Sequence, residues 1–308
     1  MSSVAFIFSG QGAQQVGMAK DLVDAYPVCR AVFEEADEIL GYALSDICFE
    51  GPAEALTRTN HCQPGIFLAS VACYRALEEQ VPDLACVGMA GLSLGEWTAL
   101  HLAGVLSFED ALRSLEARGR LMQEACESTA GGMLTVIGLE IETVESICEE
   151  TGVELANINS PGQLVLSGRS EGIESADRLA RVAGAKRTVV LEVAGAYHSE
   201  LMAPAAEQLA AFLEDVPFAA PQVPVASNAS GALHGEPEQI RKQMLDQVTS
   251  CVRWVECIEA LGATGVNEYI ECGPGKVLSG LIKRIDRDSA VNNIQNMDSL
   301  GRVVDALK

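Results

Sequence analysis

The residues around Ser93 have the pattern of a nucleophile held on a sharp turn. The chain reads Gly91-Leu92-Ser93-Leu94-Gly95 directly after an apolar run, Cys86–Gly91, and directly before a helical pattern, Glu96–Ala103. A strand–turn–helix of this kind projects the serine hydroxyl from the sheet edge, and the flanking glycines let strand and helix approach closely. The alternative is a Gly-rich turn in which Ser93 only caps the helix, and the pentapeptide alone fits both equally. The chemistry indicated is acyl transfer or hydrolysis through a serine ester.

A serine nucleophile needs a base, and His198 is the best-placed histidine. It follows a predicted strand, Lys186–Val193, and side chains just beyond a strand end can reach the edge where another strand ends. His198 could also be an ordinary loop histidine without a catalytic role. Because the chain also contains a nucleophile elbow, the interpretation of His198 as the base is preferred. An ordinary imidazole pKa of ~6.5 predicts that transfer slows as pH falls through that value. The other histidines receive no role: His101 is expected to be packed or at the surface, and His61 and His234 lie in polar stretches typical of solvated side chains.

Arg118 lies among apolar residues on a helix that follows the elbow helix. Ser107 and Asp110 have the spacing of a helix N-cap and open this helix, which is expected to run to about residue 127. A guanidinium in apolar surroundings can hold a carboxylate through two parallel hydrogen bonds. The alternatives are a side chain that reaches solvent or an ion pair with Glu116 or Glu124.

Composition limits the classes of protein that remain. The 308 residues are 48% hydrophobic and 21% charged, which excludes a disordered or fibrous chain. A formal net charge of −22 disfavours nucleic acid and anionic membranes as partners. The N-terminal apolar run is short and lacks a preceding basic region, and no apolar run reaches the ~18–20 residues of a membrane span, so a cytoplasmic location is expected. The ten cysteines form no CxxC pair, which argues against disulfides and against a metal site.

The order of predicted elements indicates an α/β fold in two parts. Residues 1–129 and 195–308 are expected to form a large domain with a parallel sheet, similar to α/β-hydrolases. Residues 130–194 read as a small inserted subdomain of ferredoxin-like βαββαβ order, and a cleft is expected between the two. The predicted strands are Val4–Ser9, Cys86–Gly91, Met133–Leu139, Val153–Asn159, Gln163–Gly168, Lys186–Val193, Val223–Ser227 and Glu268–Glu271. The predicted helices are Met18–Tyr26, Val28–Leu40, Pro64–Gln80, Glu96–Ala103, 107–127, Thr143–Thr151, Glu171–Ala183, Ala203–Leu213, Pro237–Gln247 and Val255–Leu261.

Six motifs, in order and in spacing, resemble those of malonyl-CoA:acyl carrier protein transacylases. The resemblance covers about residues 4 to 287, and six motifs in register are far more specific than any one. They are Ser9-Gly10-Gln11-Gly12-Ala13-Gln14, Gly91-Leu92-Ser93-Leu94-Gly95-Glu96, Arg118-Gly119-Arg120-Leu121-Met122-Gln123, Asn157-Ile158-Asn159-Ser160-Pro161-Gly162-Gln163, Gly195-Ala196-Tyr197-His198-Ser199 and Gly273-Pro274-Gly275-Lys276-Val277-Leu278.

The resemblance implies a ping-pong reaction without a bound cofactor, in which a coenzyme A thioester is the substrate. Ser93 would attack malonyl-CoA with His198 as base, and the phosphopantetheine thiol of acyl carrier protein would then take the malonyl group. The implied site roles are the following: backbone N–H groups of Gln11 and Leu94 as oxyanion hole, Arg118 as clamp for the malonyl carboxylate, Tyr197 and Gln11 at the acyl pocket, and a backbone carbonyl of Ser250 or a neighbour to orient His198. The ring of Tyr197 would disfavour a methyl branch on the acyl group, an effect of ~1–3 kcal/mol.

Two departures from the family pattern stand near these positions. Leu92 replaces a histidine found in many members, and Ser250-Cys251-Val252-Arg253-Trp254 replaces Asn-Pro-Val-Gln-Trp.

Docking of the carrier protein needs a local basic surface. Carrier proteins are acidic, as is this chain, so the attraction between them must be local. We expect Lys186, Arg187, Lys283 and Arg284 to provide it.

Three other functions remain open at this point. A stand-alone acyltransferase of a polyketide pathway would use the same chemistry as the fatty-acid enzyme. A serine thioesterase or other hydrolase is disfavoured because Arg118 selects a charged acyl group. A non-catalytic module that binds a carrier protein is disfavoured because Ser93 and His198 are both present.

Overall fold

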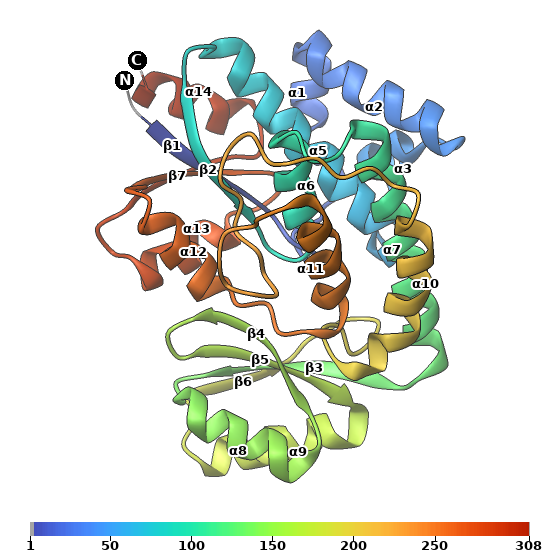
Figure 1. Cartoon of the computed structure of the whole chain (residues 1–308), viewed down its shortest axis with the longest axis vertical. Coiled ribbons are helices and arrows are strands. Elements are labelled where there is room, and N and C mark those ends of the chain that lie inside the picture. Colours follow the sequence, from blue (N-terminus) through green and yellow to red (C-terminus); the bar gives the residue numbers. More distant parts are fainter. Residues whose placement is uncertain (1–2, 308) are drawn as a thin grey trace.

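A computed structural model describes residues 3–307 as a mixed α/β protein with one parallel and one antiparallel sheet (Figure 1). The parallel sheet has the order β2-β1-β7-β8. Its strands are β1 (Ser3–Phe8), β2 (Ala85–Gly91), β7 (Glu268–Cys272) and β8 (Ala290–Ile294). Phe8 is in register with Gly91 on one side and Cys272 on the other, so the carboxyl ends of β1, β2 and β7 meet at one edge.

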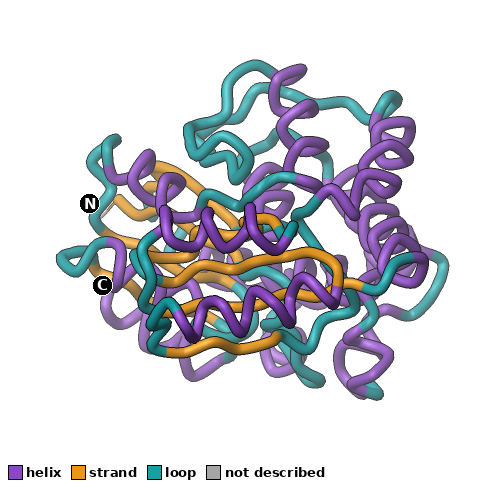
Figure 2. The backbone as a smooth tube through the Cα atoms, turned by 90° about the horizontal axis from the view of Figure 1, so that it is seen from below, coloured by secondary structure: helices purple, strands orange, loops and turns teal. Residues whose placement is uncertain are grey.

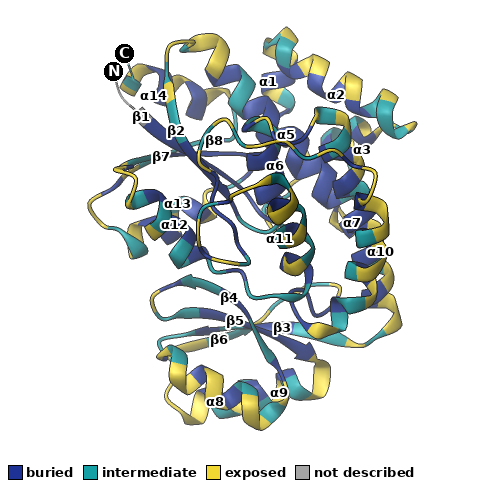
Figure 3. Cartoon of the chain, in the orientation of Figure 1, coloured by how far each residue is buried: buried dark blue, intermediate teal, exposed yellow. Residues whose placement is uncertain are grey.

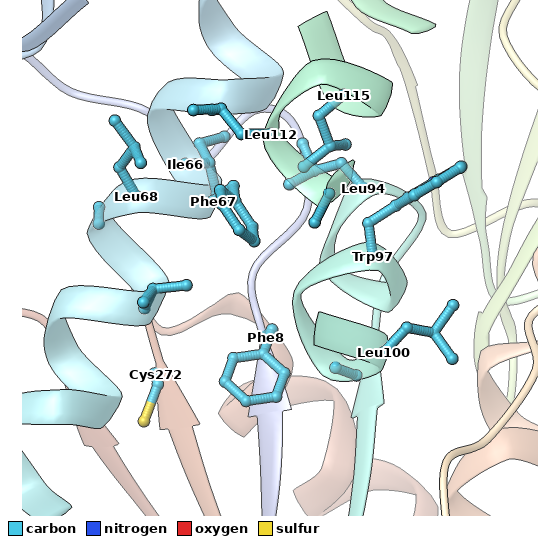
Figure 4. Packing of buried hydrophobic residues seen from close by; sticks show 14 of the residues in the cluster. Phe8, Ile66, Phe67, Leu68, Leu94, Trp97, Leu100, Leu112, Leu115 and Cys272 are labelled. Carbon is cyan, nitrogen blue, oxygen red and sulfur yellow. The ribbon is translucent and has the colours of Figure 1, made fainter. Parts of the chain in front are cut away.

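Residues Val4–Phe8 of strand β1 are all apolar, because both faces of the parallel sheet are covered. Val4, Phe6 and Phe8 belong to one buried cluster, and Ala5 and Ile7 to another. Helices α5 (Thr59–Gln80), α6 (Leu94–Leu102) and α7 (Phe108–Ser128) contribute to the first cluster, and α12 (Trp254–Gly262) and α13 (Val277–Ile285) to the second. Figure 4 shows Phe8 below the apolar side chains of α5 and α6, including Phe67 and Trp97.

The other helices outside residues 130–194 pack around this core. They are α1 (Lys20–Ala25), α2 (Pro27–Leu40), α3 (Leu44–Glu50), α4 (Ala53–Thr57), α10 (Ala203–Leu213), α11 (Pro237–Thr249) and α14 (Met297–Leu307), with a 3₁₀ turn at Glu200–Met202. The side chain of Ser107 caps α7 by accepting a hydrogen bond from the N–H of Asp110 at 3.0 Å, as its spacing predicts.

The antiparallel sheet has the strand order β4-β5-β3-β6 and its own apolar core. Its elements follow the chain as β3 (Gly131–Ile137), α8 (Ile141–Thr151), β4 (Glu154–Ser160), β5 (Gln163–Arg169), α9 (Ser170–Val182) and β6 (Arg187–Val190). Helices α8 and α9 cross one face of the sheet (Figure 2), and their outer sides are exposed (Figure 3). The other face therefore lies toward the parallel-sheet part (Figure 1).

A short backbone ladder joins β4 to the segment after α11. The N–H of Ile158 donates to the carbonyl of Val252 at 2.9 Å, and the N–H of Val252 donates to the carbonyl of Ala156 at 2.8 Å. These bonds fix the antiparallel sheet against the loop that follows α11.

All but one of the elements predicted from the sequence are present, although their ends are shifted. The exception is the predicted strand Val223–Ser227, which is not a regular strand. Val223–Ser227 makes only isolated bridges, of which one joins Val225 to Met89 beside β2. Pro224 has no N–H to donate, which limits a regular ladder there. Helix α5 begins at Thr59, earlier than predicted, and β6 ends at Val190. Five further elements were not predicted from the sequence: α3, α4, α13, β8 and α14.

Candidate active site

Ser93 stands on a strained turn between β2 and α6. Its φ of 55° and ψ of −104° are conformations that L-residues rarely adopt. A Cβ atom on Gly91 would lie 1.9 Å from the carbonyl carbon of Gly95, and one on Gly95 would lie 2.2 Å from the carbonyl oxygen of Phe8. Both glycines are thus required for the contact between strand and helix. This geometry favours the nucleophile elbow over a simple cap, and the Ser93 side chain makes no capping hydrogen bond.

Asn228 holds the turn from behind. Its Oδ1 accepts from the N–H of Ser93 at 2.7 Å, and its Nδ2 donates to the carbonyl of Gly91 at 2.9 Å. Asn228 is fully buried. It therefore satisfies two backbone groups that the sharp turn removes from regular pairing.

The hydroxyl of Ser93 lies next to His198, as the sequence predicted. Ser93 Oγ is 2.9 Å from His198 Nε2, and His198 Nδ1 is 2.8 Å from the carbonyl oxygen of Gln247. Since a carbonyl only accepts, Nδ1 carries the proton and Nε2 presents its lone pair to the serine.

The orienting carbonyl belongs to Gln247, where Ser250 was expected. Gln247 lies in the last turn of α11, where carbonyl oxygens have no partner within the helix. The backbone of Ser250 also raises the pKa of His198, but by less than the carbonyl of Gln247 does. The departures at Cys251 and Arg253 thus fall outside the orienting contact.

His198 is neutral at physiological pH. Burial lowers its pKa to about 4, and the positive charge of Arg118 lowers it further against the opposing backbone hydrogen bonds. This corrects the ordinary value of ~6.5 assumed from the sequence. A neutral imidazole with a free Nε2 lone pair is the form that can take a proton from Ser93.

Arg118 is a buried cation that points at the nucleophile. It is 1% exposed. Its Nη2 donates to Ser93 Oγ at 3.0 Å and to Gln247 Oε1 at 2.9 Å, and its Nη1 donates to Gln63 Oε1 at 2.7 Å. Burial lowers its pKa to about 10, so it stays charged at neutral pH.

The expected alternatives for Arg118 do not match its surroundings. Glu124 pairs with Arg120 at 3.0 Å. Among residues 3–307, Arg118 forms no salt bridge, and its Nε has no hydrogen-bond partner. A buried guanidinium without a carboxylate partner is costly unless a ligand supplies one.

These residues line a cleft of about 270 Å³ between the two sheets. Gln11, Ser93, Arg118, Tyr197 and His198 all border it. From the antiparallel sheet come Met133, Thr135, Asn157, Asn159 and Val165. The cleft predicted between the two parts of the chain is thus present, and the predicted acyl-site side chains meet in it.

Tyr197 and Leu94 are two further residues that the sequence predicted at the site. The Tyr197 hydroxyl is 2.8 Å from Thr59 Oγ1 and accepts from Gln11 Nε2 at 3.4 Å, which fixes its ring at the wall. Leu94 is the first residue of α6, where backbone N–H groups have no partner within the helix.

The four predicted docking cations are exposed but lie on more than one surface. Lys186 and Arg284 line a single groove of about 520 Å³ beside the antiparallel sheet, and Arg284 donates to Gln163 Oε1 at 2.6 Å. Arg187 begins β6. Lys283 lines a separate hollow with Lys276 and Arg302.

Sequence reasoning missed a layer of polar residues behind the site. His234, expected to be solvated, has a buried side chain that meets Glu96 at 2.7 Å. Gln63 and Gln247 hold Arg118. A signal was present for Glu96, which is the one carboxylate in the mostly apolar elbow helix. No comparable signal marked the others, because their partners are distant in sequence.

The other histidines and the cysteines have structural surroundings. His101 packs against Phe67 and Phe108, and His61 Nδ1 lies 2.9 Å from the carbonyl of Ala55. All ten cysteines are free thiols, buried or half-buried. Within residues 3–307, no group of His, Cys, Asp and Glu has the arrangement of a metal site, and no helix is long and apolar enough to span a membrane.

Comparison with known proteins defines the class first. Residues 5–304 match the family model of the acyl transferase domain. The chain is 42% identical to the malonyl CoA-acyl carrier protein transacylase of Bacillus subtilis, and the match covers 100% of this chain and 98% of that protein. It is 43% identical to the transacylase of the same name from Escherichia coli K12, with 92% of this chain and 93% of that protein covered. The chain therefore belongs to the malonyl CoA-acyl carrier protein transacylase family.

Solved structures agree with this assignment. An acyl carrier protein S-malonyltransferase of Vibrio cholerae superposes with a TM-score of 0.94 at 42% identity, covering 98% of this chain and 100% of that one. A malonyl-transacylase in complex with a type II PKS acyl-carrier protein superposes with a TM-score of 0.95 at 40% identity. The superposition covers 99% of this chain and 100% of that one.

Proposed function

We propose that this acyltransferase moves the malonyl group of malonyl-CoA to the phosphopantetheine thiol of acyl carrier protein, for fatty-acid synthesis. The observation that carries the substrate assignment is Arg118, a buried cation with no salt bridge in the described chain, 3.0 Å from the nucleophilic oxygen. A malonyl group on Ser93 has its carboxylate close to the ester carbonyl. It would supply the missing counter-ion through two hydrogen bonds.

The first half-reaction forms a malonyl ester on Ser93. Nε2 of His198 takes the hydroxyl proton as Oγ attacks the thioester carbonyl. The C–S bond then breaks, and the sulfur of coenzyme A leaves with the proton from His198. The backbone N–H groups of Gln11 and Leu94 are proposed to hold the oxyanion, because both belong to segments at the sheet edge beside Ser93.

The second half-reaction runs the same steps toward the carrier. The phosphopantetheine thiol gives its proton to His198, its sulfur attacks the ester carbonyl, and Ser93 leaves and regains a proton. Tyr197 is proposed to disfavour a branched acyl group, because its ring is fixed by Thr59 and Gln11 at the wall of the cleft. Lys186, Arg187, Lys283 and Arg284 are proposed to attract the carrier protein.

The fold is proposed to divide as the sequence suggested. Residues 1–129 and 195–308 would form the large domain, similar to α/β-hydrolases, and residues 130–194 the ferredoxin-like subdomain. The supporting observation is the separate apolar core of the antiparallel unit, whose members lie between Leu134 and Ala180.

A polyketide pathway is a second candidate for the same chemistry. It is favoured by the similarity to the transacylase solved with a type II PKS acyl-carrier protein. Transfer rates to purified fatty-acid and polyketide carrier proteins, compared side by side, separate the two pathways.

Mass spectrometry tests the central step. After mixing with malonyl-CoA, the protein should gain one malonyl group, located on Ser93 by peptide mapping. Ser93→Ala should gain none. An adduct on a cysteine, or rapid release of malonate to water without transfer to a carrier thiol, would overturn the proposal.

A further inference from the structure

A set of buried polar residues lies behind Ser93 and outside the cleft. Glu96, Asn228 and Gln247 are fully buried, and His234 is 9% exposed. None of them borders the cleft described above. Burying a carboxylate, an imidazole and two amides is costly unless each polar atom has a partner, so their arrangement requires an explanation.

Glu96 is the centre of this network. Its Oε1 accepts from His234 Nε2 at 2.7 Å, and its Oε2 accepts from Gln247 Nε2 at 2.5 Å and from the N–H of Asn228 at 3.2 Å. It also lies in the first turn of α6, where the helix dipole favours a negative charge. Nδ1 of His234 meets Gln243 Oε1 at 2.7 Å, which fixes the imidazole from its other side.

The carboxylate determines which way the amide of Gln247 faces. A carboxylate only accepts hydrogen bonds, so the NH₂ group of Gln247 must face Glu96. The same NH₂ donates to the carbonyl of Ser93 at 3.0 Å, and Oε1 is left to accept from Arg118 at 2.9 Å. With the amide reversed, its NH₂ group would face the donors of Arg118 and its oxygen would face a carboxylate.

We propose that Glu96, supported by His234, is a positioning residue that fixes the amide of Gln247 and thereby aims Arg118 at the acyl group. Glu96 touches neither Ser93 Oγ nor the cleft, so it acts through Gln247. The negative charge of Glu96 also partly offsets the loss of solvation that Arg118 suffers by burial. This inference rests on the proposed malonyl transfer.

Glu96→Met is the direct test. Methionine has a similar length but offers no strong acceptor, so the side chain at position 96 no longer holds the NH₂ group of Gln247, and Gln247 is free to turn that group toward Arg118. Glutamine would not serve, because its NH₂ group could face His234 Nε2 in the other imidazole tautomer while its oxygen still accepted from Gln247. We expect the ratio of kcat/KM for malonyl-CoA to that for acetyl-CoA to fall about 10–100-fold, the scale of one hydrogen bond to a charged group. The matched control is Glu271→Met, because Glu271 is also a fully buried carboxylate but holds the backbone N–H groups of Leu278 and Ser279.

A double-mutant cycle separates positioning from a general loss of stability. Glu96→Met and Glu271→Met are both expected to lower the melting temperature, whereas the malonyl-to-acetyl ratio should change only in Glu96→Met. In a Gln247→Ala background, which keeps the backbone carbonyl for His198, Glu96→Met should lower the ratio no further. If Glu96→Met does not fold, Glu96→Asp, which withdraws the carboxylate from Gln247, takes its place.

The outcomes distinguish this inference from the proposed function. An unchanged ratio in Glu96→Met, or effects of Glu96→Met and Gln247→Ala that simply multiply, overturns the positioning role. A wild-type protein that forms no malonyl ester on Ser93 overturns the proposed function itself.

Discussion

Nδ1 of His198 lies 2.8 Å from the carbonyl oxygen of Gln247, so a helix end orients the base where an acid would stand in a Ser-His-Asp triad. A neutral carbonyl fixes the tautomer but adds no negative charge. Burial and the nearby guanidinium of Arg118 therefore decide the pKa of His198, which falls to about 4.

The first prediction concerns the pH dependence of acylation. The value of kcat/KM reports ionisations of the free enzyme. Because His198 is the base and its pKa is about 4, kcat/KM for malonyl-CoA should stay level as pH falls through 6.5 and decline only near pH 4. His198→Ala should acylate ~10²–10⁴-fold more slowly at neutral pH, the range of general-base catalysis.

The same shift predicts how stability responds to acid. The pKa of His198 is lower in the folded protein than in the unfolded chain, so the unfolded chain binds the proton first. The contribution of His198 is present above ~6.5 and is lost as pH falls toward about 4. Circular dichroism at each pH must therefore accompany the kinetics. A rate midpoint near 6.5 in protein that remains folded would contradict the lowered pKa of His198.

The second prediction concerns the contact beneath the elbow. In Gly95→Ala, the new Cβ would meet the carbonyl oxygen of Phe8 at 2.2 Å, so α6 must move away from β1. We expect a lower melting temperature and a loss of transfer activity larger than the stability change explains, because the hydroxyl of Ser93 moves with α6. Differential scanning calorimetry and steady-state kinetics measure the two effects.

Gly301→Ala is the matched control for that substitution. Gly301 lies inside α14 and a Cβ there meets nothing within 4 Å. Alanine should stabilise this helix by about 0.5–1 kcal/mol and leave transfer unchanged. Equal losses in both variants would show that the close approach at Gly95 has no special importance.

The parts of the site that the sequence predicted have local signals. Gly91 and Gly95 bracket Ser93 within five residues, and the strand and helix on either side can be recognised from their own patterns. His198 and Arg118 could be named because their residue types are rare in such surroundings. The order of elements along the small unit, βαββαβ, could likewise be predicted, because each element has its own short sequence pattern.

The missed parts depend on contacts between distant segments. The partner of His198 was placed at Ser250 or a neighbour on the strength of the family resemblance, whereas the carbonyl that meets Nδ1 is that of Gln247, in the last turn of α11. His234 was read as solvated because its own neighbours are polar, whereas Glu96, far earlier in the chain, buries it. The pKa of His198 could not be derived either, because burial exists only in the folded chain.

The third prediction concerns docking of the carrier protein. Lys186 and Arg284 share one groove, so Lys186→Glu and Arg284→Glu should raise the KM for acyl carrier protein several-fold at low salt. Acylation by malonyl-CoA should change little in both. Arg187→Glu should act in the same direction, whereas Lys283→Glu tests the separate hollow that it lines.

Lys20→Glu provides the control for charge alone. Lys20 is a half-exposed lysine that begins α1 and pairs with Asp24, and Lys20→Glu changes the net charge by the same amount as Lys186→Glu. If all these variants raise the carrier KM equally, the effect comes from total charge. If none does so at low salt, the four cations are ordinary surface residues.

The last prediction concerns acyl selectivity and Arg118. Arg118→Ala leaves the malonyl carboxylate buried and unpaired, which typically costs about 3–5 kcal/mol. Transfer of malonyl should therefore fall about 10²–10⁴-fold, since each 1.36 kcal/mol is tenfold in rate. The same change removes a cation that an uncharged acyl group leaves unpaired, so acetyl transfer should fall little or rise. Arg118→Lys should replace it poorly, because an ammonium cannot make the two parallel bonds of a guanidinium while also reaching Gln63 and Gln247. The ratio of kcat/KM for malonyl-CoA to that for acetyl-CoA decides the matter: an equal fall for both substrates would make Arg118 a structural residue and remove the main support for a malonyl substrate.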